Sequence, residues 1–264
     1  MSDAPSIYEV WRDALREERP VALATVIDGP DAGSKLLVER DGTIMGSLGN
    51  EDLDRVVSRD ALAELDMGLT EVRHYGARGE ARQADVSVFI ESRAPKPQML
   101  IFGAVDFTRA LAEQAKFLGY RVTVCDAREV FATRKRFPMA DEVVVDWPNR
   151  LLERVGDDLG PRDAVCVLTH DAKFDVPAIT SALRTRVGYI GAMGSRKTHD
   201  TRSDRLREEG VTDDELARIL APIGIDIGAR SPEETAVSIC AEIIALRTGR
   251  AAPSLKDGEG PIHA

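Results

Sequence analysis

Apolar residues follow one pattern in the first third of this chain and a different one afterwards. Short alternating runs indicate strands at residues 21–26, 35–39, 43–45, 71–75 and 85–91. Helical periodicity covers residues 7–18 and about 51–65. Asp41-Gly42 between two of the strands favours a tight hairpin, because both residues tolerate positive φ. The first part of the sequence therefore predicts a small α+β domain.

Further along, continuous apolar strands alternate with helical patterns. The strands are expected at residues 98–102, 121–125, 142–145, 164–168 and 187–190. A helix between the first two presents Phe107, Leu111 and Leu118 on its apolar face. The last long helix begins at Ser231-Pro232, with an N-cap serine and a proline in the first turn. This alternation predicts a Rossmann-like α/β domain, a parallel sheet covered on both faces.

Two prolines, Pro95 and Pro97, separate these patterns, because a residue before proline avoids helical geometry. We expect an N-terminal α+β domain over residues 1–94 and a Rossmann-like domain over residues 98–250. Residues 251–264 are rich in glycine and proline and are expected to form a flexible tail.

The 264 residues carry a net charge of −10, which argues against a nucleic-acid partner. No apolar run is long enough for a membrane span, and the acidic N-terminus lacks a signal-peptide pattern, so we expect a cytoplasmic protein. Cys125, Cys166 and Cys240 lie far apart within apolar stretches. We interpret them as small buried hydrophobic residues and expect no metal site.

Ligands of open parallel sheets bind beyond the carboxyl ends of the strands, so the loops there are the candidate sites. Gly103 follows the first strand and fits a dinucleotide fingerprint, but Val105 replaces the second glycine. The alternative is a strand-to-helix turn capped by Asp106. Asp126 ends the second strand, 23 residues after Gly103, where nucleotide-binding domains hold a ribose. A role for Asp126 as a strand-end cap fits equally well.

Thr169, His170 and Asp171 follow the fourth strand and are expected to line the crevice. For Thr169 and Asp171, the alternative is a structural role in forming the turn. Three other histidines are expected at the surface: His74, His199 and His263.

The loop after the fifth strand is the most informative. Gly191 and Gly194 give a turn whose amides can converge, and Ser195 can cap a new helix. Arg196 and Lys197 would then lie in its first turn, where basic residues oppose the helix dipole. A bound phosphate explains that placement, and a solvated basic turn is the alternative.

Three ordered segments are specific in combination: Thr169-His170-Asp171 with Phe174-Asp175-Val176-Pro177, residues 189–197 (Tyr-Ile-Gly-Ala-Met-Gly-Ser-Arg-Lys), and residues 221–229 (Ala-Pro-Ile-Gly-Ile-Asp-Ile-Gly-Ala). Together they resemble the XdhC/CoxI family of accessory proteins for molybdenum hydroxylases such as xanthine dehydrogenase and carbon monoxide dehydrogenase. The resemblance implies binding of molybdenum cofactor, as molybdopterin or its dinucleotide form. It also implies an oxo-for-sulfido exchange with a cysteine desulfurase, and delivery of the cofactor to a hydroxylase apoenzyme.

The chain resembles a divergent member that lacks the N-terminal cysteine motifs. Residues 47–51 read Ser-Leu-Gly-Asn-Glu where the family has Gly-Gly-Cys-Val-Glu, and residues 83–87 replace a Cys-Gly-Gly stretch. Residues 103–107 read Gly-Ala-Val-Asp-Phe in place of Gly-Ala-Gly-His-Val. If the family cysteines bind molybdenum, this chain does not bind it in the same way.

The leading hypothesis is a non-catalytic cofactor chaperone that serves a molybdenum hydroxylase and can form a homodimer. In it Ser195, Arg196 and Lys197 bind phosphate, Asp126 meets a ribose or pterin, and the segment 169–171 contacts polar groups of the cofactor. One alternative is an NAD(P)-dependent oxidoreductase, although Val105 stands in place of a glycine and no Tyr/Lys or His/Asp catalytic pair is obvious. The other is a scaffold that has lost its ligand.

Overall fold

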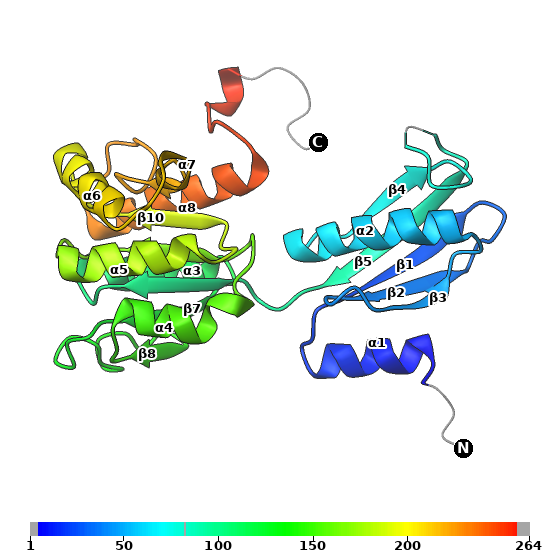
Figure 1. Cartoon of the computed structure of the whole chain (residues 1–264), viewed down its shortest axis with the longest axis horizontal. Helices are drawn as coiled ribbons and strands as arrows, with labels where there is room; N and C mark the ends of the chain where they lie inside the picture. The colour runs from blue at the N-terminus through cyan, green and yellow to red at the C-terminus, as the bar shows by residue number, and fades with distance from the viewer. Residues whose placement is uncertain (1–4, 82, 258–264) are drawn as a thin grey trace. The chain divides into compact units, whose positions relative to one another are not determined.

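The computed structural model describes residues 5–81 and 83–257, and it divides into two compact units, Met1–Pro95 and Lys96–Ala264 (Figure 1). His263 and residues 258–264 of the expected tail lie outside the described residues. Within the described parts, every helix is too short or too polar to span a bilayer.

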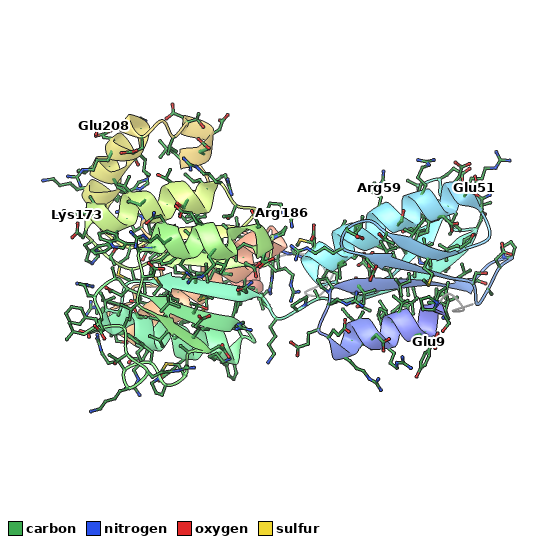
Figure 2. All side chains as sticks on the ribbon, turned by 60° about the horizontal axis from the view of Figure 1, so that its bottom comes forward. Glu9, Glu51, Arg59, Lys173, Arg186 and Glu208 are labelled. Carbon is green, nitrogen blue, oxygen red and sulfur yellow. The ribbon has the colours of Figure 1, made fainter. Side chains whose placement is uncertain are left out.

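The N-terminal unit is an antiparallel sheet between two helices. Its five strands have the order β3-β2-β1-β5-β4. Helices α1 and α2 lie on opposite faces of the sheet, as Glu9 on α1 and Glu51 and Arg59 on α2 show in Figure 2. The elements are α1 (Ile7–Arg16), β1 (Val21–Asp28), β2 (Lys35–Glu39), β3 (Ile44–Ser47), α2 (Glu51–Met67), β4 (Glu71–Tyr75) and β5 (Val86–Arg93). The predicted α+β fold is confirmed.

The predicted hairpin joins β2 to β3. Gly42 has a φ of +88°, and the Thr43 amide donates to the Asp41 carboxylate at 2.9 Å. Both features follow from the Asp-Gly dipeptide, which accommodates the positive φ of the turn. The core of this unit packs α2 against the sheet through buried Val57, Leu36 and Ile90.

The C-terminal unit holds a six-stranded parallel sheet of order β11-β10-β9-β6-β7-β8. Its first strand therefore lies in the middle, and the strand order reverses between β6 and β9, as in dinucleotide-binding Rossmann sheets. The strands are β6 (Gln98–Phe102), β7 (Arg121–Cys125), β8 (Glu142–Val144), β9 (Ala164–Val167), β10 (Tyr189–Ala192) and β11 (Ile219–Leu220). The helices are α3 (Asp106–Phe117), α4 (Pro148–Val155), α5 (Ala172–Leu183), α6 (Arg196–Glu208), α7 (Asp213–Leu216) and α8 (Pro232–Thr248).

Helices cover both faces of this sheet (Figure 1), and an apolar layer lies on each face. Met99 and Ile101 of β6 pack with α3 and α8 on one face. Leu100 and Phe102 pack with α4 and α5 on the other. Successive strand residues thus enter opposite cores, which explains why the strands read as continuous apolar runs. The Rossmann-like prediction is confirmed.

Local signals identified the start of α8 correctly. Ser231 caps α8, its hydroxyl accepting from the Glu234 amide in a capping box, and Gly249 ends the helix at a φ of +63°. Predicted strand bounds differ from the observed ones by up to two residues; β10, for example, covers Tyr189–Ala192 where the pattern predicted 187–190. All three cysteines are buried, as interpreted from their apolar surroundings.

Candidate functional site

The switch point of the parallel sheet lies between β6 and β9, and the residues that follow these strands meet there. Gly103 has a φ of +109°, and a Cβ on it would lie 2.6 Å from Thr169 Cγ2 and 3.2 Å from the Thr169 amide nitrogen. A glycine is thus required where the two loops approach.

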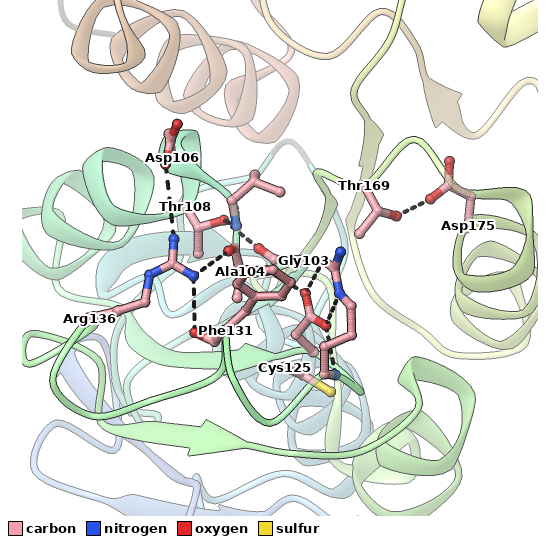
Figure 3. Close-up of polar contacts among 12 residues, drawn as sticks. Gly103, Ala104, Asp106, Thr108, Cys125, Phe131, Arg136, Thr169 and Asp175 are labelled. Carbon is pink, nitrogen blue, oxygen red and sulfur yellow. Dashed lines mark hydrogen bonds and ion pairs between the residues drawn. The ribbon is translucent and has the colours of Figure 1, made fainter.

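The turn from β6 into α3 has its backbone amides occupied by acceptors of the protein (Figure 3). The Gly103 amide donates to the Cys125 carbonyl at 2.9 Å, and the Ala104 amide donates to Asp126 Oδ2 at 2.8 Å. The Val105 amide donates to Thr108 Oγ1 at 3.2 Å. In a dinucleotide-binding turn the backbone approaches a pyrophosphate, and here these three donors already have partners.

In the alternative interpretation of this turn, the cap of α3 by Asp106 is wrong. Val105 is the N-cap residue without a side-chain hydrogen bond, and Asp106 is the first helical residue. The Asp106 side chain is 94% exposed. Its carboxylate favours the helix dipole but repels an anion approaching this turn.

Asp126 is a buried strand-end cap in this structure. Besides the Ala104 amide, its carboxylate accepts from the Arg128 amide at 2.9 Å and from the Arg128 guanidinium at 2.9 and 2.7 Å. Burial raises the pKa of Asp126, but the hydrogen bonds from Arg128 and Ala104 outweigh it and hold that pKa below its usual value. A contact with a ribose or pterin stays a prediction.

Arg136 was not identified from the sequence, yet it lies against the same turn (Figure 3). Its Nη1 donates to the Ala104 carbonyl at 3.0 Å and the Phe131 carbonyl at 3.2 Å, while Nη2 lies 4.0 Å from Asp106 Oδ1. The segment between β7 and β8 thus holds the β6–α3 turn in place with a guanidinium.

A series of hydrogen bonds between buried polar side chains connects the switch point with α6. The Thr169 hydroxyl donates to Asp175 Oδ1 (Figure 3), and Arg202 Nη2 donates to Asp175 Oδ2 at 2.9 Å. The same Nη2 donates to the Met193 carbonyl at 2.8 Å. Burial raises the pKa of Asp175, and the contacts with Thr169 and Arg202 oppose that rise.

A pocket of about 290 Å³ is lined by the start of α5 and by α6 from its N-cap Ser195 to Arg205. Asp171 caps α5 by accepting from the Lys173 amide at 3.0 Å, and Ser195 caps α6 by accepting from the Thr198 amide at 3.2 Å. Two helix N-termini are therefore close to a pocket with several cationic side chains, an arrangement suited to an anion. Its lining residues are His170, Ala172, Asp175, Ser195, Lys197, Thr198, Thr201, Arg202 and Arg205.

Three predicted site residues, His170, Ser195 and Lys197, come together in this pocket. Arg196 is exposed and is not among the lining residues. Gly194 precedes the cap with a φ of +141°, as a turn glycine.

Two positional expectations are corrected. Gly191 lies inside β10 and not in the turn, and a Cβ there would lie 2.6 Å from the Ile223 side chain, so this glycine allows close packing. His199 is half-buried and not on the surface, with no hydrogen-bond partner for Nδ1 among the described residues. Burial and the nearby Arg202 lower its pKa.

The described residues that line the pocket include no set of ligands placed to hold a metal ion. Across residues 5–81 and 83–257, no group of three His, Cys, Asp or Glu side chains is placed to hold a metal ion. The pocket's donor set, made of ammonium, guanidinium and hydroxyl groups, suits anion oxygens.

Comparison with known families matches both units. Residues 99–243 match the family model described as the XdhC Rossmann domain, and residues 14–76 match the XdhC and CoxI family. The chain belongs to the XdhC and CoxI family. The pocket falls within the stretch matched by the XdhC Rossmann domain.

Several proteins are similar to this XdhC-family chain. A Bacillus subtilis (strain 168) protein, named as a probable subunit of xanthine dehydrogenase, is 32% identical over 246 residues, which cover 91% of this chain and 64% of that protein. The "uncharacterized protein YqeB" of Escherichia coli (strain K12) is 28% identical over 240 residues, covering 86% and 44% respectively. The chain thus spans less than two thirds of either relative.

A shorter match and a solved structure complete the comparison. The "molybdenum cofactor insertion chaperone PaoD" of Escherichia coli (strain K12) is 37% identical over 84 residues, covering 32% of this chain and 26% of PaoD. A crystal structure described as a xanthine dehydrogenase from Bacillus halodurans aligns with a TM-score of 0.54 at 21% identity, covering 95% of this chain and 98% of that one. At this identity the likeness supports a shared fold.

Proposed function

We propose that this chain is an accessory protein for a molybdenum hydroxylase, and that it binds the phosphorylated pterin of molybdenum cofactor at the start of α6. The observation that carries the proposal is the contrast between two helix starts in one Rossmann-like unit. Amides at the α3 turn already have protein acceptors, whereas the α6 turn combines a serine cap with cations.

The α6 start offers donors that a phosphate can use. The first amides of a helix have no intrahelical acceptor, and Ser195 satisfies one of them, that of Thr198. Lys197 and His170 lie on the pocket wall, and the first turn of α6 contains no acidic residue. An anion bound there compensates the unfavourable position of Arg196 and Lys197 next to the positive end of the dipole.

The names of the relatives point to the same class of ligand. One relative is named a molybdenum cofactor insertion chaperone, and another is named as part of a xanthine dehydrogenase. A hydroxylase of the xanthine or carbon monoxide dehydrogenase type is the proposed partner. When bound, the cofactor supplies the molybdenum chemistry of that partner, and the residues of this chain hold its phosphate and polar ring groups.

The roles proposed for the segment after β9 differ among its members. His170 is exposed on the pocket wall, where it can contact the ligand. The Thr169 hydroxyl is already bonded to Asp175, so Thr169 supports the site indirectly. Asp171 fixes the start of α5.

Binding of molybdopterin released from a molybdenum enzyme tests the proposal. We expect it to raise the melting temperature of the full chain, and the double variant Arg196→Ala/Lys197→Ala to lose most of that shift. Arg207→Ala, later on α6 and paired with Asp204 and Asp213, is the control for loss of a cation. An equal shift in the double variant refutes the site. A shift with NAD or NADP alone would favour an NAD(P)-dependent oxidoreductase. If no ligand shifts the melting temperature, a scaffold that has lost its ligand would be favoured.

A further inference from the structure

We propose that Arg202 makes the α6 pocket a site for a phosphate monoester dianion. The inference rests on the proposed function for the identity of the whole ligand, while the pocket's own residues determine the class of group bound. It adds to the predicted Ser195–Lys197 loop a buried residue that sequence patterns did not identify.

Arg202 is buried and only partly paired. Its side chain is 4% exposed, and the hydrogen bonds that it makes within the described part of the chain, to Asp175 and to the Met193 carbonyl, use Nη2. Nη1 is buried and has no hydrogen-bond partner among the described residues. A buried charged donor without an acceptor is unfavourable, and a guanidinium cannot escape by losing its proton. The Nη1 donor therefore needs an acceptor that lies outside the described part of the chain.

The position of Arg202 in the pocket wall indicates that a bound ligand supplies this acceptor. Arg202 belongs to the pocket wall, seven residues after the Ser195 cap and on the same face of α6 as Thr198 and Arg205. Nη2 is already used by Asp175 and the Met193 carbonyl, so in this proposal a phosphate oxygen is the acceptor for Nη1. Guanidinium N–H groups form charge-assisted hydrogen bonds with phosphate oxygens.

The charge of the lining residues selects a dianion. Three cations, Lys197, Arg202 and Arg205, face one carboxylate, Asp175, which leaves 3 − 1 = +2 with His170 neutral. The Asp175 carboxylate is already bonded to Arg202 and Thr169. A phosphate monoester carries close to two negative charges at neutral pH, whereas a carboxylate or a phosphate diester carries one.

Hydroxyl groups provide the remaining contacts. Ser195 and Thr198 lie 2.9 Å apart between their side-chain oxygens, and the Thr201 hydroxyl donates to the Lys197 carbonyl at 3.2 Å. All three line the pocket, beside the first amides of α6. A tetrahedral group with three terminal oxygens can use donors on several sides, as this pocket presents them.

The test uses the folded full chain with inorganic phosphate, phenyl phosphate and dimethyl phosphate, each titrated by calorimetry at pH 8. We expect the first two to bind and dimethyl phosphate to bind at least about tenfold more weakly, because it carries a single charge. Binding of the diester as tight as that of the monoester would overturn the inference. Binding of inorganic phosphate without phenyl phosphate would restrict the site to the free ion and also overturn it.

Arg202→Lys keeps the charge and removes the forked donor, so affinity for phenyl phosphate should fall about tenfold. The matched control is Arg218→Lys. The Arg218 guanidinium donates to the carbonyls of Leu183 and Thr185, away from the pocket. If Arg202→Lys does not fold, Arg205→Ala replaces it, because Arg205 is exposed, with Arg207→Ala as its control. Unchanged affinity in the folded Arg202 or Arg205 variant would refute the inference.

These outcomes separate the inference from the proposed function. If phenyl phosphate binds through Arg202 but molybdopterin does not bind, the anion site stands and the cofactor assignment fails. If molybdopterin binds equally well to wild type and Arg202→Lys, the cofactor assignment stands and the role of Arg202 fails.

Discussion

Gly103 and Thr169 approach so closely that a Cβ atom on Gly103 would lie 2.6 Å from Thr169 Cγ2. This contact joins the loops after β6 and β9, the two strands between which the strand order reverses. A glycine in this turn is usually associated with access for a pyrophosphate. Here the same residue is needed to let one loop of the protein pack against another.

Replacing Gly103 with alanine should therefore destabilise the C-terminal unit. The substitution combines an overpacked contact, typically about 1–3 kcal/mol, with a φ of +109° that costs about 1–2 kcal/mol more. Urea unfolding of the full chain measures the loss.

Gly119→Ala separates the two contributions, because Gly119 has a φ of +87° and a Cβ atom added to it would meet nothing within 4 Å. Thr169→Ser in the Gly103→Ala background removes the clashing methyl and keeps the hydroxyl that donates to Asp175. It should restore part of the stability. Equal losses in the two glycine variants, with no rescue by serine, would show that the contact with Thr169 is unimportant.

Asp126 should contribute stability that depends on pH. Its pKa is lower in the folded chain than the usual value of about 3.9, so its contribution is complete above that pH and is lost as the pH falls through the folded pKa. Asp126→Asn should cost about 1–3 kcal/mol at pH 7, because a charged acceptor of two backbone amides and Arg128 is removed.

The cost of Asp126→Asn should shrink below about pH 4, where the wild-type carboxylate begins to take up its proton. Asp106→Asn is the control at the same turn, since its carboxylate is exposed and should change stability by no more than about 0.5 kcal/mol. A cost for Asp126→Asn that is constant from pH 7 to pH 3 would contradict this account.

For Glu64 in the N-terminal unit, we predict the opposite dependence of stability on pH. It is 1% exposed on α2, one oxygen contacts Arg73, and the other has no partner among the described residues. Burial outweighs Arg73 and raises the pKa of Glu64 to about 7. The folded chain holds this proton more tightly than the unfolded chain. The contribution of Glu64 to the stability of the fold is therefore greatest below about pH 4 and falls as the pH rises through 7.

Denaturant titrations of wild type and Glu64→Gln between pH 5 and pH 8 test that dependence. The wild type should lose up to about 3 kcal/mol over its full transition, and the glutamine variant, which cannot ionise, should lose much less. Parallel curves for the two proteins would mean that Glu64 does not titrate in this range.

Much of the fold follows from local rules in the sequence. Asp41-Gly42 specifies a hairpin and Ser231-Pro232 a helix start without help from distant residues. Apolar runs predicted the parallel sheet because each strand is buried on both faces. Gly191 was misplaced because a glycine that allows packing within a strand has the same local pattern as one that begins a turn.

The parts of the site that sequence patterns missed are made by distant contacts. Arg202 meets Asp175 from 27 positions away, and Arg136 meets the Ala104 carbonyl from 32 positions away. Neither arginine differs from an exposed one in its local pattern. Asp175 had a weak signal, as a single carboxylate between Phe174 and Val176 that the helix turns toward the interior. Ser195 was predictable because an N-cap is a local feature.

The three cysteines should be inert to thiol reagents in the native chain. Burial raises the pKa of Cys125 to about 12 and that of Cys240 to about 11, and it raises the pKa of the fully buried Cys166 as well. Since the thiolate is the reactive form, a disulfide reagent at pH 8 should modify none of them rapidly, and all three after unfolding in urea. Rapid modification of one thiol in the folded chain would contradict this burial. Cys→Ser variants, one position at a time, would then identify the reactive residue.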